Sequence, residues 1–583
     1  MLFGKFEIHG LSPCGQRIGL APALRNGEGV IYRLAMDSAE PTPAEVLNQP
    51  PPLENYDLFR SDTALVEAVT RDGAHWGFDD LSAFGRTMGK AETLALGDTA
   101  NREVPKLRPV DRYGHRIDAV DFHPAYHALM AMQIAQGVHC SPWSDPKPGA
   151  QVHRAAGLYL SAQVEAGTGC PVSMTYAVVP VLRQAPEIAS EWIPRLFSRT
   201  YDPAHKPATE KAGALIGMTM TEAQGGSDLR SNTTRAEPMG RAGTGEAYRV
   251  TGRKWFMSAP MCDAFLVLAQ APGGLACFFL PRWKPDGTLN ALRLVRLKDK
   301  LGNRSNASSE VEFEGAYAVM IGDEGRGIPT IIEMASYTRL DNVVASAGIQ
   351  RRAVAEAIHH ATHRSAFQKR LIDQPLMTGV LADLALETEA ATALAFRLAR
   401  AFDNDADEQE VALRRVITPA AKFYICKRGP ALAAEALEVL GGNGYIEESG
   451  MPRIYRELPI NSIWEGSGNV MALDTARALD RHPACGDALI AELMLSKGAD
   501  GRLDAAIESL SDTLMTRPAE SDLRRFCQEV TLTLQAALLA RHAPPAISDA
   551  FIASRLSRED GRVFGTLPSG CDVRAIVDRA APQ

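Results

Sequence analysis

The spacing of apolar residues changes twice along this 583-residue chain, and the two changes limit the folds that it can adopt. From Asp57 to about Pro207, apolar residues recur three and four apart, as in residues 64–69, which predicts α-helices. After Gly213 the period becomes two, as in half-buried strands, and from Ile328 the helical period returns. The predicted order is therefore helical, β, helical.

Several strands can be recognised in the β-region. Residues 247–251 and 310–313 alternate apolar and polar side chains. Between them, the apolar runs Phe265–Gln270 and Leu275–Leu280 are separated by a Pro-Gly-Gly turn, which predicts a β-hairpin. We therefore expect a β-domain that follows the first helical region.

The second helical region contains three long stretches with the helical period, at Ile328–His363, Leu376–Phe402 and Pro419–Leu440. More helices are expected from about His482. Long helices that lie side by side form a bundle. A chain of this length holds several units, each with its own core. The predicted division is residues 1–47 (N-terminal extension), 48–213 (helical domain), 214–320 (β-domain), 321–480 (helical bundle) and 481–583 (extra helical module).

The first 47 residues differ from the rest because they contain Gly and Pro and lack a helical period. Met36 stands just before the polar run 38–43. One hypothesis is that translation starts at Met36. Mass spectrometry of the native N-terminus tests it, since a peptide spanning Arg33 to Met36 would contradict it.

The composition is that of an ordinary globular enzyme, with 45% hydrophobic and 23% charged residues. No run approaches 18 apolar residues and no secretory signal opens the chain, so we expect neither a membrane span nor secretion. The nine cysteines form no CxxC pair, which favours reduced thiols in the cytoplasm. The net charge of −8 argues against a nucleic-acid surface along the whole chain.

A Gly-rich segment, Thr221–Asp228, lies where the helical region gives way to strands. Gly225 and Gly226 let backbone N–H groups approach an anion, and the hydroxyls of Thr221 and Ser227 add donors. The segment could hold a phosphate or a flavin. By itself it also fits a Gly-rich turn with an Asp cap.

The segment Gly252–Ser258 reads as a strand with two aromatic residues beside a hydroxyl. Such an aromatic wall suits a planar redox ring. Aromatic residues favour strands in any case, so strand core is the competing interpretation.

Two further Gly-containing segments follow, Leu440–Tyr445 and Ile463–Asn469. The first also fits a helix C-cap with a tight turn. The second places Glu465 between apolar residues and glycines, and an acid in apolar surroundings is held at the higher pKa that a general base needs. Alone, Glu465 also fits a residue at the start of a helix.

Two histidine pairs are spaced four residues apart, His123 with His127 and His359 with His363. Such pairs can ligate zinc from one helix face. No neighbouring Cys or HExxH arrangement completes a ligand set, so we interpret all four as surface or core residues and predict no metal site.

Taken in their order along the chain, these motifs are more specific than any one of them alone. Over residues 57–479 the chain resembles the acyl-CoA dehydrogenase family, because five motifs follow one another in the family's order. They are Thr-Glu-x-x-x-Gly-Ser-Asp, Lys-x-aromatic-x-Ser, Arg-x-x-Phe on a long helix, Gly-Gly-x-Gly-Tyr and Glu-Gly-Ser. The runs 231–235, 297–307 and 461–469 resemble its AidB, or alkylation-response, branch.

The resemblance implies an N-terminal helical domain, a barrel-like middle β-domain and a C-terminal four-helix bundle, in a mainly α chain with an extra C-terminal helical module. It also implies FAD bound between the β-domain and the bundle. Phe256 stands where most relatives have tryptophan. The residues expected to contact FAD are Met218, Thr221, Gly225, Gly226, Ser227, Phe256, Met257, Ser258, Arg364, Phe367, Gly441, Gly442, Ser467 and Asn469.

Arg364 and Phe367 match a family motif whose arginine reaches the FAD diphosphate of a neighbouring subunit. A guanidinium suits this role because it pairs bidentately with phosphate. Gln368 replaces the usual glycine, and Glu438 stands where many relatives have glutamine. The resemblance therefore implies a homo-oligomer, and the family suggests a tetramer.

The family reaction removes a proton from the carbon next to a thioester carbonyl while hydride passes to flavin N5. Glu465 matches the base, and an acyl-CoA-like substrate is expected near Arg339. Some relatives carry their base immediately before that arginine, but this chain has Thr338 there. The electron acceptor is expected to be another redox protein of unknown identity.

Relatives of the AidB type are associated with binding of double-stranded DNA through a basic C-terminal region. Residues 481–583 hold 12 Lys and Arg against 14 Asp and Glu, which lacks the basic excess of a DNA-binding domain. Local clusters remain at Arg524-Arg525 and at Arg555, Arg558 and Arg562. Two hypotheses follow: a thioester-dehydrogenating flavoenzyme, or a DNA-associated flavoprotein with vestigial activity.

Overall fold

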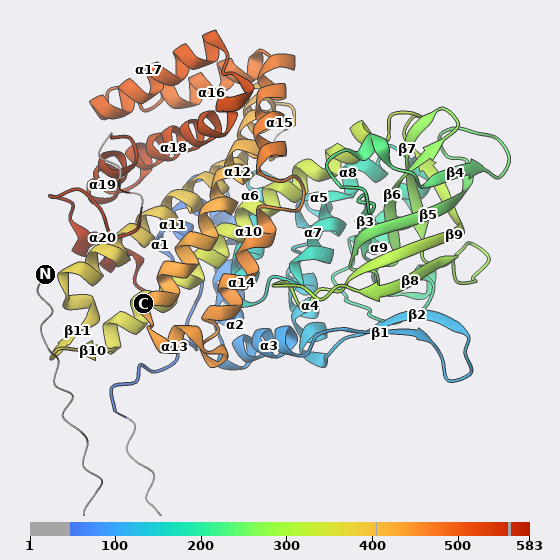
Figure 1. The fold of residues 1–583 in the computed structure, drawn as a ribbon, viewed down its shortest axis with the longest axis horizontal. Helices are drawn as coiled ribbons and strands as arrows, with labels where there is room; N and C mark the ends of the chain where they lie inside the picture. The colour runs from blue at the N-terminus through green and yellow to red at the C-terminus, as the bar shows by residue number, and fades with distance from the viewer. Residues whose placement is uncertain (1–46, 404, 558–560, 562, 583) are drawn as a thin grey trace, which may run out of the picture. The chain divides into compact units, whose positions relative to one another are not determined.

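The computed structural model describes residues 47–403, 405–557, 561 and 563–582. The predicted start at Met36 and residues 1–46 lie outside the described residues. From Asn48 onward the chain forms one compact unit (Figure 1).

The first part of this unit is helical, as predicted. The helix α6 (Ala150–Val164) is buried along its whole length and packs against the long bundle helix α10 (Gly327–His363). The other helices are α1 (Thr63–Arg71), α2 (Phe78–Met88), α3 (Ala91–Arg102), α4 (Pro124–Gln136), α5 (Ser141–Ser144), α7 (Gly169–Ala177), α8 (Val179–Leu182) and α9 (Pro186–Leu196).

An antiparallel hairpin interrupts this helical part, which the helical period did not predict. Its strands are β1 (Lys106–Val110) and β2 (Arg116–Asp121). No residue of β1 is fully buried, so the segment lacks the apolar face by which a strand is recognised in a sequence. The hairpin packs against β8 (Leu292–Leu297) of the β-domain.

The β-domain is a closed barrel (Figure 1). The strand β7 (Gly274–Pro281) pairs with both β6 (Ala264–Ala271) and β9 (Ser308–Ile321), which closes the sheet. The predicted hairpin is β6–β7, in full antiparallel register. The remaining strands are β3 (Ile216–Thr219), β4 (Arg235–Pro238) and β5 (Ala247–Ser258).

Three long helices form the centre of the bundle: α10, α11 (Pro375–Ala401) and α12 (Glu408–Val439). The prediction placed the start of α12 at Pro419, but the helix begins at Glu408, where Asp407 caps two backbone N–H groups. Pro419 lies within the helix. The bundle is completed by α13 (Gly442–Tyr445), α14 (Met451–Asn461) and α15 (Gly468–Arg481). None of the described helices has the length and apolar character needed to cross a membrane.

Five further helices follow, of which α16, α18, α19 and α20 lie against α11 or α12, while α17 packs on α16, α18 and α19 (Figure 1). Ion pairs join them to α11: Glu492 of α16 pairs with Arg397, and Arg555 of α19 pairs with Asp383. Glu492 also pairs with Arg541 of α18. The helices are α16 (Ala484–Met494), α17 (Gly501–Thr516), α18 (Leu523–His542), α19 (Pro545–Arg555) and α20 (Val573–Ala580).

Candidate active site

Glu465 lies in the short loop between α14 and α15, in an unusual backbone conformation. Its φ is 58° and that of Gly466 is 113°, so two consecutive residues occupy the left-handed half of backbone space. A Cβ on Gly466 would lie 2.4 Å from Cε of Met471. Glycine is therefore required beside the candidate base.

Two long cationic side chains hold this loop through its backbone carbonyls. Arg339 on α10 donates from Nε to the carbonyl of Glu465 at 2.9 Å, and from Nη1 to Asp474 at 2.8 Å. Lys422 on α12 donates to the carbonyl of Gly466 at 2.8 Å. Arg339 is thus placed beside Glu465 as expected for a residue near the substrate, whereas Lys422 was not predicted to take part.

The carboxylate of Glu465 has a hydrogen-bond donor of its own. The Thr338 hydroxyl donates to its Oε2 at 2.8 Å. Burial raises the pKa of the Glu465 carboxyl above its ordinary value, while Thr338, Arg339 and Lys422 act in the opposite direction. A partly buried carboxylate with a raised pKa is suited to taking a proton from a weakly acidic carbon.

Cys170, in the first turn of α7, connects Glu465 with the end of strand β5. Burial raises the pKa of the Cys170 thiol to about 12; its hydrogen bond with Ser258 lowers it, and the charge of Glu465 raises it further. The thiol thus responds to both residues, so Ser258 and Glu465, which are far apart in sequence, lie in the same region of the fold.

The Gly-rich segment forms a turn directly after β3 and beside the end of β5. The backbone N–H of Trp255 donates to the carbonyl of Thr221 at 2.9 Å. A Cβ on Gly226 would lie 2.6 Å from the Thr221 hydroxyl, so this hydroxyl projects over a bare stretch of backbone. Gly226 and Ser227 are exposed. The turn thus offers backbone and hydroxyl donors, which suits the diphosphate of FAD.

A buried ion pair fixes the shape of this turn. Glu222 accepts from Nζ of Lys254 at 2.8 Å, and from the backbone N–H and hydroxyl groups of Thr233 and Thr234. Burial lowers the pKa of Lys254 to about 8, against the effect of Glu222. The pair explains the Glu of the first motif and the Lys of the second, whose roles the sequence alone did not show.

The side chains at the end of β5 alternate between solvent and core. Phe256 is 47% exposed, although it is a large aromatic residue, and its backbone carbonyl accepts from Thr219 at 3.0 Å. Met257 and Met218 point into the barrel core and are buried. Phe256 and Ser258 can therefore flank a flat ring, whereas Met257 offers only its backbone to that side.

Arg364 and Phe367 lie far from this cluster in the same chain. Arg339 and Arg364 are separated along α10 by about 37 Å at 1.5 Å per residue, which is longer than an extended FAD. Phe367 is 93% exposed at the tip of the small hairpin β10 (Ser365–Ala366) and β11 (Lys369–Arg370). Phe367 and Gln368 both have positive φ, as a two-residue hairpin turn requires.

Gly441 and Gly442 belong to this second cluster. The side chain of Asn48 exchanges hydrogen bonds of 2.8 Å with the backbone of Ser365, and Gln49 bonds Asn443 at 2.9 Å, which ties the hairpin to the glycine turn. Both glycines are exposed with open space around the Cα atoms. The predicted cofactor residues thus form two groups in one chain.

Ser467 and Asn469 flank the start of α15, next to the Glu465 loop. Ser467 occupies the N-cap position but makes no side-chain capping bond. The side-chain oxygen of Asn469 accepts from Arg524 of α18 at 2.7 Å. The C-terminal helices therefore reach the predicted cofactor residues.

The four histidines considered as zinc ligands make hydrogen bonds within the protein, and His363 bonds the carbonyl of His359 on its own helix. His123 accepts from the backbone N–H of Ala125 at the start of α4, and His127 bonds Tyr201 at 2.9 Å. His359 bonds the carbonyl of Pro51. Within the described ranges no three His, Cys, Asp or Glu residues are grouped as metal ligands would be.

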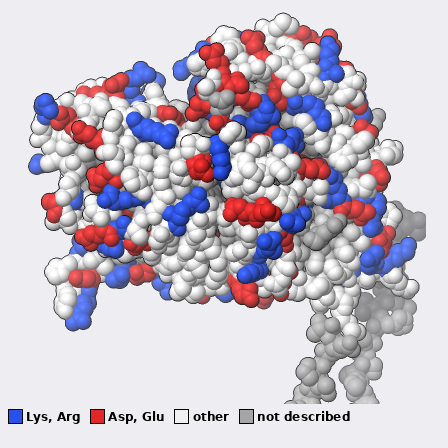
Figure 2. Space-filling view, turned by 180° about the vertical axis from the view of Figure 1, so that it is seen from behind, with Lys and Arg blue, Asp and Glu red and all other residues white. Residues whose placement is uncertain are grey.

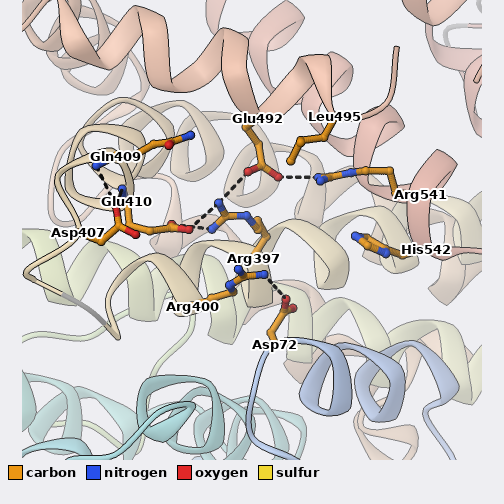
Figure 3. A pocket seen from close by; sticks show the side chains of 10 residues that line it. All are labelled: Asp72, Arg397, Arg400, Asp407, Gln409, Glu410, Glu492, Leu495, Arg541 and His542. Carbon is orange, nitrogen blue, oxygen red and sulfur yellow. Dashed lines mark hydrogen bonds and ion pairs between the residues drawn. The ribbon is translucent and has the colours of Figure 1, made fainter. Parts of the chain in front are cut away.

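A cavity of about 180 Å³ lies elsewhere, where the C-terminal helices meet α11 and α12 (Figure 3). Its walls are mostly charged, and ion pairs link Arg397 with Glu410 and Glu492 across it. None of the predicted site residues lines it. The cavity is a polar gap beside an ion-pair network that holds the two groups of helices together.

Three family models match consecutive parts of the chain. They are the adaptive response protein AidB N-terminal domain at residues 48–203, the acyl-CoA dehydrogenase middle domain at 217–316, and the acyl-CoA dehydrogenase C-terminal domain at 325–479. The chain is also 50% identical to AidB of Escherichia coli over 518 residues, which are 88% of this chain and 95% of that protein. The chain belongs to the acyl-CoA dehydrogenase family. Within it, the chain belongs to the AidB branch.

Solved structures agree with this assignment. ACDH-11 of Caenorhabditis elegans, in complex with C11-CoA, matches with a TM-score of 0.80 and 27% identity over 95% of each chain. The Bacillus anthracis acyl-CoA dehydrogenase complexed with FAD matches with a TM-score of 0.59 and 16% identity, over 78% of this chain and 88% of that one, and supports the fold. The predicted acyl-CoA dehydrogenase fold is confirmed, and the family is one of FAD-binding oxidoreductases.

Proposed function

We propose that this protein is an FAD-dependent dehydrogenase of acyl-CoA-like thioesters, with Glu465 as the base that removes the α-proton. The observation that carries the proposal is the setting of Glu465. Its carboxylate is partly buried, accepts a hydrogen bond from Thr338 and acts electrostatically on the Cys170 thiol, which also interacts with Ser258 of the predicted flavin wall.

The proton is taken by an oxygen of the Glu465 carboxylate. Burial raises the pKa of this group, which strengthens it as a base, and the Thr338 hydroxyl fixes the orientation of Oε2. Arg339 and Lys422 hold the loop by its carbonyls. When bound, FAD would supply the acceptor for the hydride that leaves the carbon next to the deprotonated one, and we expect another redox protein to take the electrons onward.

The proposed cofactor site needs two subunits. Thr221, Gly225, Gly226 and Ser227 would hold the diphosphate of one FAD, with its ring between Phe256 and Glu465. Arg364, Phe367, Gly441 and Gly442 would meet the FAD of a neighbouring chain, because the length of α10 keeps them from their own. We therefore propose a homo-oligomer, a tetramer by family likeness, working in the cytoplasm, and retain the five-part division of the chain.

Anaerobic titration with acyl-CoAs of different chain length tests the proposal, with loss of the oxidised flavin absorbance as the signal. Glu465→Gln should retain the flavin spectrum and abolish the bleaching. Glu448→Gln, an exposed acid on the neighbouring segment, is the matched control and should bleach as the wild type does. Bleaching by the Glu465 variant at the wild-type rate would refute its role as the base.

The alternative is a DNA-associated flavoprotein of the response to alkylation damage. Of its candidate contacts, Arg555 is buried in ion pairs with Asp383 and Glu387, while Arg558 and Arg562 lie outside the described residues. Figure 2 shows Lys and Arg interspersed with Asp and Glu over one face of the molecule. Retention on duplex DNA tests the alternative: binding should fall steeply with salt, and flat or absent binding contradicts it.

A further inference from the structure

Two cationic side chains from different parts of the chain come together at the start of α15. Lys427 lies on α12, and Arg524 comes from α18 among the C-terminal helices. A Cβ on Gly468 would lie 3.1 Å from Nζ of Lys427 and 3.5 Å from Nη1 of Arg524. Both charges therefore lie within reach of one small group placed over this glycine.

Neither charge has a carboxylate partner in the part of the chain that the structure describes. Among the residues that the structure describes, no carboxylate lies within 4.0 Å of Lys427 or of Arg524. Arg524 has only the neutral side-chain oxygen of Asn469, and both cations lie over the ring of Phe423, at 5.8 and 5.3 Å. Arg541, on the same helix as Arg524, pairs with Glu492 instead.

Both side chains are exposed, and an anion bound between them would relieve the repulsion of their charges. Partial burial lowers the pKa of Lys427, and the nearby charge of Arg524 lowers it further. Like charges held together without a counter-ion repel each other. The backbone N–H groups of the first turn of α15 add positive character to the same point, since Ser467 does not cap them.

We propose that Lys427 and Arg524 together bind a phosphate group over Gly468. A guanidinium and an ammonium are the two side-chain groups that recognise phosphate best, one by paired hydrogen bonds and the other as a point charge. The bare Cα of Gly468 leaves room for the end of the Lys427 side chain, whose Cε lies 3.0 Å from the position of a Cβ.

The phosphate has two possible sources. Gly468 lies between Ser467 and Asn469 and three residues after Glu465, so one source is the diphosphate of the flavin nucleotide, an assignment that rests on the proposed function. The other source is free phosphate. In either case, a residue of the C-terminal helices takes part in the site, which gives this extra module a role in binding.

The experiment compares the wild type, the double variant Lys427→Gln/Arg524→Gln and the control Arg525→Gln, each with the flavin that it carries as purified. Arg525 is exposed on α18 and adjacent to Arg524. The FAD dissociation constant is measured by flavin fluorescence on dilution. Binding of added inorganic phosphate is followed by ³¹P NMR, and far-UV circular dichroism confirms the fold. Lys427→Arg retains the charge and should bind as the wild type does.

If the cofactor supplies the phosphate, the double variant should bind FAD roughly 10- to 100-fold more weakly, and the control should be unchanged. If FAD binding is unchanged but only the wild type and the control bind inorganic phosphate, the site exists and takes free phosphate. Equal binding of both ligands by wild type and double variant would overturn the proposal. Should the protein carry no flavin, the proposed function fails, and the phosphate titration alone decides on the site.

Discussion

The Thr338 hydroxyl donates a hydrogen bond of 2.8 Å to Oε2 of Glu465 across 127 residues of sequence. Thr338 occupies the position that some relatives use for their base, so the two positions meet in space. The hydroxyl stabilises the charged form of Glu465 and opposes the effect of burial on its pKa.

Thr338→Val removes this donor and should raise the pKa of Glu465 further. Because the base works only when ionised, the acidic limb of kcat/KM against pH should move to higher pH. Thr362→Val is the control, since the Thr362 hydroxyl bonds only the carbonyl of Ile358 on its own helix. An unchanged pH profile in the Thr338 variant would show that this hydrogen bond does not act on the base.

Lys422 is fully buried and its pKa is lowered to about 8, chiefly by burial. The unfolded chain therefore binds this proton more tightly than the folded one, and stability rises with pH between about 8 and 10.5. Lys422→Met removes the titrating amine and, with it, this contribution to the pH dependence of stability. Between pH 8 and pH 10.5, the free energy of unfolding of the wild type should rise by up to about 3 kcal/mol relative to that of the variant. Urea unfolding of both proteins at pH 8 and pH 10 measures the gain, and parallel curves would contradict it.

Glu492 pairs with Arg397 at 2.7 Å and with Arg541 in the network beside the cavity (Figure 3). Burial raises its pKa, but the two arginines outweigh this and lower it to about 2. Its stabilisation is present above the ordinary pKa and is lost as the pH falls toward 2. Glu492→Gln should cost about 2–3 kcal/mol at pH 7 and less below pH 4. Thermal unfolding at both pH values checks this, and a constant difference would contradict it.

Phe367 and Tyr445 are 93% and 81% exposed, which is unusual for large aromatic residues outside an interface. If the second cluster meets another subunit, Phe367→Ser should shift the protein toward smaller species in analytical ultracentrifugation. Tyr113→Ser is the matched control, because Tyr113 is 70% exposed between the strands of the β1–β2 hairpin. Equal sedimentation of both variants and the wild type would argue against this interface.

The period of apolar residues predicted the order of helical and β parts and the β6–β7 hairpin, because buried faces leave a regular pattern. It missed β1, which has no fully buried residue, and β2, whose two buried residues are adjacent and do not alternate. It also missed the start of α12, because Pro419 fits a first helical position but lies inside the helix. In both places tertiary contacts decide the structure and leave little local pattern.

For the site, motif order identified Glu465, Thr338 and Arg339, and the structure places them together. Cys170 and Lys422 could not be predicted, since a single Cys or Lys without a motif carries no signal of its neighbours. The slight acidic excess of residues 481–583 argued against DNA binding, and one of the candidate arginines, Arg555, is held in ion pairs with Asp383 and Glu387.

The left-handed pair Glu465–Gly466 bears on the order in which the native state assembles. A non-glycine residue with positive φ persists only when its surroundings enforce it, and here the enforcing groups, Arg339 and Lys422, come from two different helices. We expect a refolding chain to recover its helical signal and its barrel before this loop locks. Competence for proton abstraction would then return as a late kinetic phase, after the secondary structure is complete.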